Sequence, residues 1–123
     1  ALELGADSLL VSSDPEAMAR SANAFDLIID TVPVDHDINP YMPLLDVDGT
    51  LVIVGQVGPI AAPSTVPLLL GRRRIAGSPI GGLKQTQELL DFCARKNILP
   101  DVEMILREEI HHAFTRREKA GLH

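Results

Sequence analysis

Two uninterrupted apolar runs constrain the fold of this chain most strongly. Leu27, Ile28 and Ile29 follow one another without a polar residue, and the run LVIV at residues 51–54 is equally continuous. A strand with one face in solvent alternates apolar and polar residues, whereas a buried strand of a parallel sheet needs apolar side chains on both faces. The runs therefore predict two parallel strands, at residues 25–30 and 50–54, that are buried on both faces.

Helix signals lie around these strands. Asp14 before Pro15 is typical of a helix start, with a capping side chain and a proline in the first turn, and predicts a helix to about residue 22. Residues 84–96 form the clearest helix pattern, which Asn97 can end in a left-handed conformation. Shorter helices are expected at residues 38–45, 66–70 and 110–119, with Asp37 or Asn39 as a cap for the first of these.

Weaker strand signals complete the pattern, at residues 8–12, 74–77 and 102–105, and Asp48-Gly49 predicts a turn before the second apolar run. The alternation of strand and helix predicts an α/β fold, a parallel sheet with flanking helices and right-handed crossovers.

Composition limits the function further. A chain of 123 residues is expected to form one small domain, and its net charge of -6 disfavours a nucleic acid partner. No apolar run reaches the 18 or so residues that span a bilayer, so no membrane partner is expected. Cys93 is the single cysteine, which excludes an intramolecular disulfide and a multi-cysteine zinc site and fits a reducing, cytoplasmic location. The start ALELGAD resembles the last turn of a helix that ends at Gly5, and predicts a helical segment before Ala1.

Ligands of open α/β sheets bind at the carboxyl ends of the strands. No G-x-G-x-x-G loop occurs in the chain. Polar or glycine-rich residues nevertheless follow three of the expected strands, and the third of these strands lies within the segment GRRRIAGSPIGG. The candidate positions are Asp30, Thr31, Val32, Gly55, Ser78, Pro79 and Ile80.

Several residues whose side chains could take part in catalysis or ligand binding have simpler structural explanations. A carboxylate at Asp30 is better explained as a loop acceptor than as a catalytic group. The run Asp35-His36-Asp37 and the acidic and histidine residues near 108–112 are interpreted as solvated, because consecutive residues rarely converge on one metal ion. The arginines at residues 72–74 enter a strand away from its tip and are interpreted as solvated or edge-protecting charge. Leu89, Leu90, Phe92 and Cys93 are expected to face inward from their helix, with Cys93 an inert thiol.

The order and spacing of four segments resemble a known family. LELGAD, FDLIIDTVPVDHDINPYMPLLDVDGTLVIVG, GRRRIAGSPIGG and KQTQELLDFCARKNILPDVEMI are similar to the cinnamyl-alcohol-dehydrogenase-like branch of the zinc-dependent medium-chain alcohol dehydrogenases. The resemblance implies that residues 1–123 are the later part of an NAD(P)-binding Rossmann domain, without its first βαβα portion and without the catalytic domain.

That resemblance implies NADP(H) as cofactor and reversible hydride transfer between the nicotinamide and a small-molecule alcohol or aldehyde, with zinc as Lewis acid in the full-length enzyme. The resemblance implies that the nicotinamide and ribose are lined by Thr31, Val32, Gly55 and residues 78–80. A glycine admits a flat ring, the hydroxyls offer hydrogen bonds, and Val32 gives an apolar wall. The zinc ligands and the glycine loop have no counterpart, so this chain alone is expected to be inactive.

Two other functions compete. FDLII followed by LLDVDGTLVIVG also resembles the middle of an S-adenosylmethionine methyltransferase, although GRRRIAGSPIGG does not fit the antiparallel hairpin expected there. A noncatalytic folding or dimerisation module is the third possibility, with a homodimer through the edge strand that begins at Arg74 and ends at Ser78. In the strand order of the resembled fold, residues 8–12 would lack their neighbours. We expect one of three explanations for this missing neighbour. Residues 1–14 are disordered, residues 8–12 pair directly with residues 25–30, or the chain is a piece cut from a larger protein.

Overall fold

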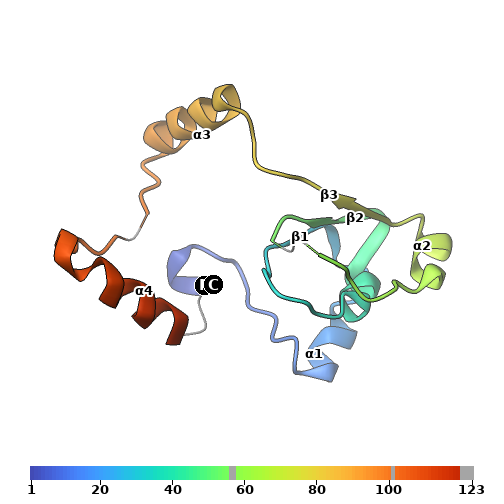
Figure 1. The fold of residues 1–123 in the computed structure, drawn as a ribbon. Helices are drawn as coiled ribbons and strands as arrows, with labels where there is room; N and C mark the ends of the chain where they lie inside the picture. The colour runs from blue at the N-terminus through green and yellow to red at the C-terminus, as the bar shows by residue number, and fades with distance from the viewer. Residues whose placement is uncertain (56–57, 101, 120–123) are drawn as a thin grey trace. The chain divides into compact units, whose positions relative to one another are not determined.

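The chain is organised around a small parallel sheet. A computed structural model describes residues 1–55, 58–100 and 102–119, which divide into two compact units, Ala1–Pro79 and Ile80–His123. In the first unit, strands β1 (Phe25–Asp30), β2 (Leu45–Ile53) and β3 (Arg74–Gly77) pair in parallel in the order β1-β2-β3 (Figure 1). The predicted α/β class, with parallel strands joined by helical crossovers, is confirmed.

Strand β2 begins earlier than the sequence predicts. It starts at Leu45, directly after the 3-10 helix η2 (Asn39–Leu44), and continues through Asp48 and Gly49. Asp48 adopts a left-handed conformation with φ 64°, and the pairing with β1 jumps from Phe25↔Leu45 to Leu27↔Thr50. The predicted turn at Asp48-Gly49 therefore falls inside β2, where three more residues than on β1 lie between these two pairs and interrupt the regular pairing.

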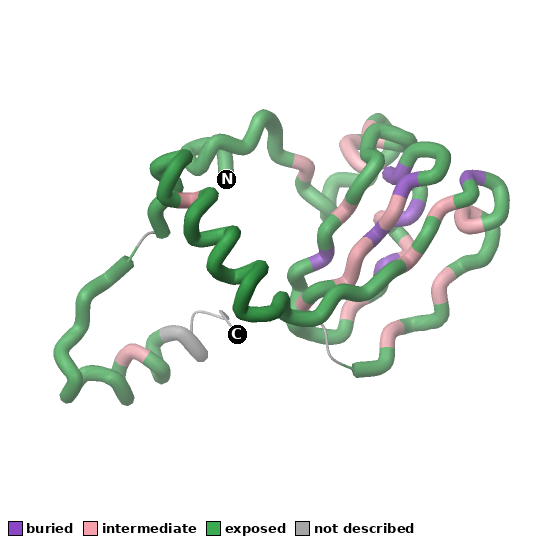
Figure 2. Tube along the Cα trace, turned by 90° about the horizontal axis from the view of Figure 1, so that it is seen from above, coloured by how far each residue is buried: buried purple, intermediate pink, exposed green. Residues whose placement is uncertain are grey.

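One face of the sheet carries the core of the first unit. Ile38, Met42, Leu45 and Leu51 form a buried cluster, and Ile28, Ile53, Leu68 and Ile75 pack against it. Ile28, Leu51 and Ile75 are register partners on the three strands, so their side chains point to the same face. The helices η2 and α2 (Thr65–Gly71) supply the covering residues, and the buried positions in Figure 2 all fall in this unit.

The second face of the sheet differs from the prediction. Leu27 is 54% exposed and Ile29 is 58% exposed, although both lie in the uninterrupted apolar run of β1. The prediction that the strands are buried on both faces is therefore wrong for the described structure. An apolar strand is buried only where another element covers it, and the first unit covers one face.

Local signals gave the right helix ends in the first unit. Asp14 accepts hydrogen bonds from the amides of Glu16 and Ala17, both at 3.0 Å, and caps α1 (Pro15–Arg20). Gly5 has φ 91° and ends the 3-10 helix η1 (Leu2–Leu4), as its sequence context predicts.

The second unit consists of α3 (Leu83–Lys96), η3 (Arg107–Glu109) and α4 (Ile110–Lys119). Asn97 ends α3 in the predicted left-handed conformation, with φ 53°. Leu89, Leu90 and Phe92 are exposed and Cys93 is half-buried, so the expected inward orientation of this helix face is wrong here. No helix of the described ranges is long and apolar enough to span a membrane.

Two of the weaker predicted strands are absent. Residues 8–12 and 102–105 are irregular, and the sheet contains neither. Direct pairing of residues 8–12 with β1 is therefore wrong. A short apolar run becomes a strand only where a neighbouring strand accepts its backbone hydrogen bonds, and that condition is not visible in the run itself.

Candidate functional site

The carboxyl ends of the three strands lie at one edge of the sheet. Asp30, Ile53 and Gly77 occupy the same register position on β1, β2 and β3. Because the strands are parallel, the residues that follow them emerge on the same side. The convergence of the turns after β1, β2 and β3, predicted from the sequence, is confirmed by this register.

Gly55 brings the turns after β1 and β2 into backbone contact. A Cβ placed on Gly55 would lie 2.3 Å from the carbonyl carbon and oxygen of Thr31 and 2.8 Å from the amide nitrogen of Val32. The carbonyl of Asp30 accepts hydrogen bonds from the amides of Val54, at 2.9 Å, and Gly55, at 3.2 Å. Only glycine fits this approach without a shift of the backbone.

The third turn is joined to the second in the same way. Ser78 donates its amide to the carbonyl of Ile53 at 3.2 Å, and its hydroxyl contacts the carbonyl of Pro79 at 3.3 Å. Ile80 is 97% exposed and begins the second unit. The first unit thus brings together five of the six predicted cofactor-contact positions: Thr31, Val32, Gly55, Ser78 and Pro79.

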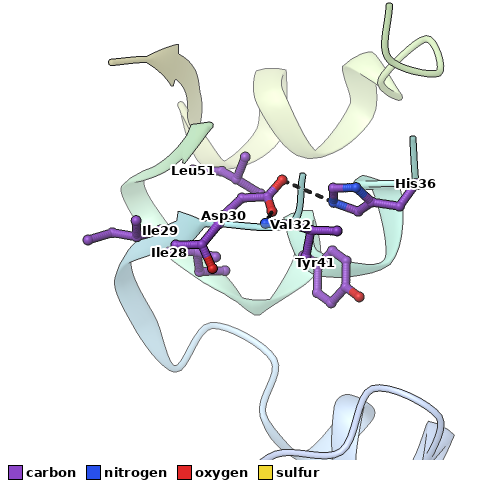
Figure 3. Close-up of a pocket in the computed structure, with 8 residues that line it drawn as sticks. Ile28, Ile29, Asp30, Val32, His36, Tyr41 and Leu51 are labelled. Atoms are coloured by element: carbon purple, nitrogen blue, oxygen red, sulfur yellow. Dashed lines mark hydrogen bonds and ion pairs between the residues drawn. The ribbon is translucent and has the colours of Figure 1, made fainter. Parts of the chain in front are cut away.

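Asp30 is the buried polar residue at the site. Its Oδ1 accepts the amide of Val32 at 3.0 Å, which confirms the interpretation of this carboxylate as a loop acceptor. Its Oδ2 lies 3.0 Å from Nε2 of His36, and the two side chains are only 8% and 18% exposed (Figure 3). Oδ2 has no hydrogen bond of good geometry within the described chain, so Nε2 of His36 is a close polar neighbour of this oxygen and not a well-aligned donor to it.

The interpretation of Asp35-His36-Asp37 as a solvated loop is wrong for its central residue. His36 is tied down by Asp30 and by the carbonyl of Val34, which lies 2.9 Å from Nδ1. Its ring also meets the ring of Tyr41 in an edge arrangement, with centroids 6.5 Å apart. The sequence carries no signal for this pairing, because the partners are six residues apart in an irregular loop. Asp37 accepts the amide of Asn39 at 2.9 Å, but the N-cap of η2 is Ile38 and no side chain caps this helix, so the predicted cap at Asp37 or Asn39 is wrong.

A hollow of about 200 Å³ opens beside this pair. Side chains of β1, its following loop and η2 line it, among them Val32, His36 and Tyr41 (Figure 3). Pockets that enclose a drug-sized ligand measure roughly 300–1,000 Å³. The hollow therefore has room for one small ring or group, but not for a dinucleotide.

The arginines at the start of β3 lie far along the strand from these turns. Arg72 and Arg74 both pair with Asp48, and the hydrogen bond from Arg72 lowers the pKa of Asp48 below its ordinary value and raises that of Arg72. Arg73 donates to the carbonyl of Leu45 at 2.8 Å. Arg72 and Arg74 are exposed, as their interpretation as solvated charge predicts, whereas Arg73 is half-buried and is a structural tether that the sequence did not reveal.

The described residues do not form a metal site. They contain no group of three or more histidine, cysteine, aspartate or glutamate side chains that could hold an ion.

Comparison with known proteins identifies the class of this fold. Residues 1–95 match the model of the zinc-binding dehydrogenase family, and the chain belongs to that family. It is 51% identical over 121 residues to 8-hydroxygeraniol dehydrogenase of Catharanthus roseus, an alignment that covers 98% of this chain and 33% of that protein. The chain thus spans about a third of the length of the curated relatives it matches.

Solved structures of related proteins share the fold. The cinnamyl alcohol dehydrogenase SbCAD4 of Sorghum bicolor matches with a TM-score of 0.86 and 36% identity, over 95% of this chain and 33% of that one. The cinnamyl alcohol dehydrogenase of Helicobacter pylori, solved with NADP(H), matches with a TM-score of 0.65 and 35% identity, over 80% of this chain and 29% of that one. The resemblance to the cinnamyl-alcohol-dehydrogenase-like branch and the truncated Rossmann-like fold are confirmed, and the methyltransferase alternative finds no support.

Proposed function

We propose that residues 1–123 are the later part of the nucleotide-binding domain of an NADP(H)-dependent alcohol dehydrogenase. The whole enzyme would transfer a hydride between the nicotinamide and a small-molecule alcohol or aldehyde. Support comes from the family match and from the H. pylori relative, which was solved with NADP(H). A cytoplasmic location, expected from the single cysteine, is part of this proposal.

The backbone contact at Gly55 carries the proposal. It holds the turns of Thr31 and Val32 beside the end of β2, and the amide of Ser78 joins the end of β3 to the same edge. A flat ring can approach a backbone that has no side chain, while hydroxyls at Thr31 and Ser78 offer hydrogen bonds to its amide or to the ribose. Thr31, Val32, Gly55, Ser78, Pro79 and Ile80 are the proposed cofactor-contact residues.

The zinc of the family does not fit the residues described here, as the single cysteine and the absence of a ligand cluster in the described ranges show. The chain by itself is therefore expected to bind the nicotinamide end of the cofactor weakly and to give no turnover. An assay of NADPH oxidation with an aldehyde would show activity if this expectation is wrong.

Titration of the isotope-labelled chain with reduced nicotinamide mononucleotide tests the proposed site. We expect the amide signals of Thr31, Gly55 and Ser78 to shift together, and Ser78→Ala to weaken binding by about 3- to 10-fold, the equivalent of one hydrogen bond. Ser64→Ala is the matched control, because Ser64 precedes α2 with an exposed side chain that makes no capping bond. Shifts confined to the second unit, or an equal effect of both variants, would contradict the proposal.

A dimerisation module is the second candidate, favoured by the open edge of β3. In the order β1-β2-β3 the third strand has one pairing partner, and its far edge offers backbone groups to a second copy of the chain. Ser78 donates its amide toward β2, so by alternation Gly77 directs its amide to the open edge.

Light scattering at several protein concentrations tests this homodimer. We expect Gly77→Pro, which removes the outward donor, to shift the chain to a monomer, while Gly77→Ala stays dimeric. A chain that is monomeric without any substitution would exclude a dimer through residues 74–78.

A further inference from the structure

The structure points to His36 as a positioning residue for the nicotinamide turn, acting through Asp30. We infer that the pair closes the loop after β1 and holds Thr31 and Val32 in the conformation that lines the proposed cofactor site. This inference rests on the proposed cofactor site and adds to it a residue that is not among the proposed cofactor-contact residues.

The contacts form a closed circuit. The amide of Val32 donates to Oδ1 of Asp30 at 3.0 Å, Oδ2 of the same carboxylate lies 3.0 Å from Nε2 of His36, and Nδ1 of His36 lies 2.9 Å from the carbonyl of Val34. The two ends of a seven-residue loop are thereby joined through one buried carboxylate. Thr31 and Val32 lie inside that circuit, so their backbone cannot rearrange without breaking one of its contacts.

The chemistry of the ring explains why histidine suits this position. Both of its nitrogens face oxygen atoms, one on a carboxylate and one on a carbonyl. Histidine is short enough to reach back to the Val34 carbonyl with one nitrogen while the other lies beside the buried carboxylate of Asp30.

The surroundings hold the ring in place. Tyr41 of η2 meets His36 edge to face, and Met42 of the same short helix is fully buried in the core. The η2 segment therefore connects the position of His36 to the hydrophobic core. The carbonyl of Asp30 in turn accepts the amides of Val54 and Gly55, which extends the circuit to the turn after β2.

Hydrogen exchange of the Val32 amide tests the inference in the isotope-labelled chain without any cofactor. In His36→Ala we expect exchange at Val32 to accelerate by about 10-fold or more, because the carboxylate that accepts this amide loses its anchor. In His36→Gln the side-chain amide can place a polar N–H beside Oδ2 in the same way, so exchange should return to within about 3-fold of the natural chain. His111→Ala is the control, since His111 is an exposed histidine of the second unit.

A second readout separates positioning from general stability. His36→Ala should weaken binding of reduced nicotinamide mononucleotide by about 10-fold, and by more than His36→Gln does, while the core amides of Leu45 and Leu51 stay protected from exchange. Unchanged exchange at Val32 in His36→Ala would overturn the inference, as would a loss of protection throughout the sheet. If the natural chain shows no response to the mononucleotide, the proposed function fails, and the exchange measurement still decides whether His36 holds the turn.

Discussion

Gly55→Ala should separate the turns after β1 and β2. The new Cβ would lie 2.3 Å from the carbonyl carbon and oxygen of Thr31, whereas ordinary contact begins at 3.4 Å, so the backbones must move apart by about 1.1 Å. The displaced atoms belong to the main chain on both sides, so no flexible side chain can absorb the shift.

The expected loss in the free energy of unfolding follows from the contacts that this displacement breaks. Overpacking of this kind costs about 1–3 kcal/mol. The hydrogen bond from the Gly55 amide to the carbonyl of Asp30 is already 3.2 Å long and would be lost, which adds about 1 kcal/mol. We therefore expect the free energy of unfolding of the first unit to fall by about 2–4 kcal/mol.

Urea unfolding followed by the amide signals of Ile53 and Val54 measures this loss in the unit concerned. Gly77→Ala is a matched control at the end of the neighbouring strand, because its added Cβ would meet only the carbonyl oxygen of Ile53, at 3.8 Å. The control should stay within about 0.5 kcal/mol of the natural chain. A Gly55→Ala midpoint equal to that of Gly77→Ala would refute the packing argument.

Substitutions at a core residue, an ion pair and a helix end further test the fold. Leu51→Ala, at a core side chain that is 1% exposed, should lower the free energy of unfolding by about 2–5 kcal/mol in urea titrations, whereas Leu70→Ala, at 84% exposure, should leave it within about 0.5 kcal/mol. The folded-state pKa of Asp48 lies below its ordinary value of 3.8, so its contact with Arg72 stabilises the fold above that pH and is lost as the pH falls through the folded-state pKa. Asp48→Asn should therefore be less stable than the natural chain at pH 6, with the difference shrinking in acid; a constant difference would rule out the ionic origin. Asn97→Gly should keep or slightly raise the helicity of α3, since φ is 53° there, and Asn97→Val should lower it in circular dichroism.

The sequence by itself determined the features that depend on near neighbours. The cap at Asp14, the left-handed stops at Gly5 and Asn97 and the strands at Phe25–Asp30 and Arg74–Gly77 all follow from side chains within a few residues. The shared edge of the strand ends was predictable as well, because parallel strands place their carboxyl ends together whatever their side chains are.

Tertiary structure decided what depends on distant partners. Residues 8–12 have a strand-like composition and yet are not in the sheet, and Asp48-Gly49 lies within β2, at an irregular stretch of its pairing with β1. The pairing of Asp30 with His36 depends on η2 packing its Met42 into the core beside Tyr41, which positions the ring. Burial and pairing are set by what the folded chain brings alongside a residue, and the order of neighbouring residues does not contain that information.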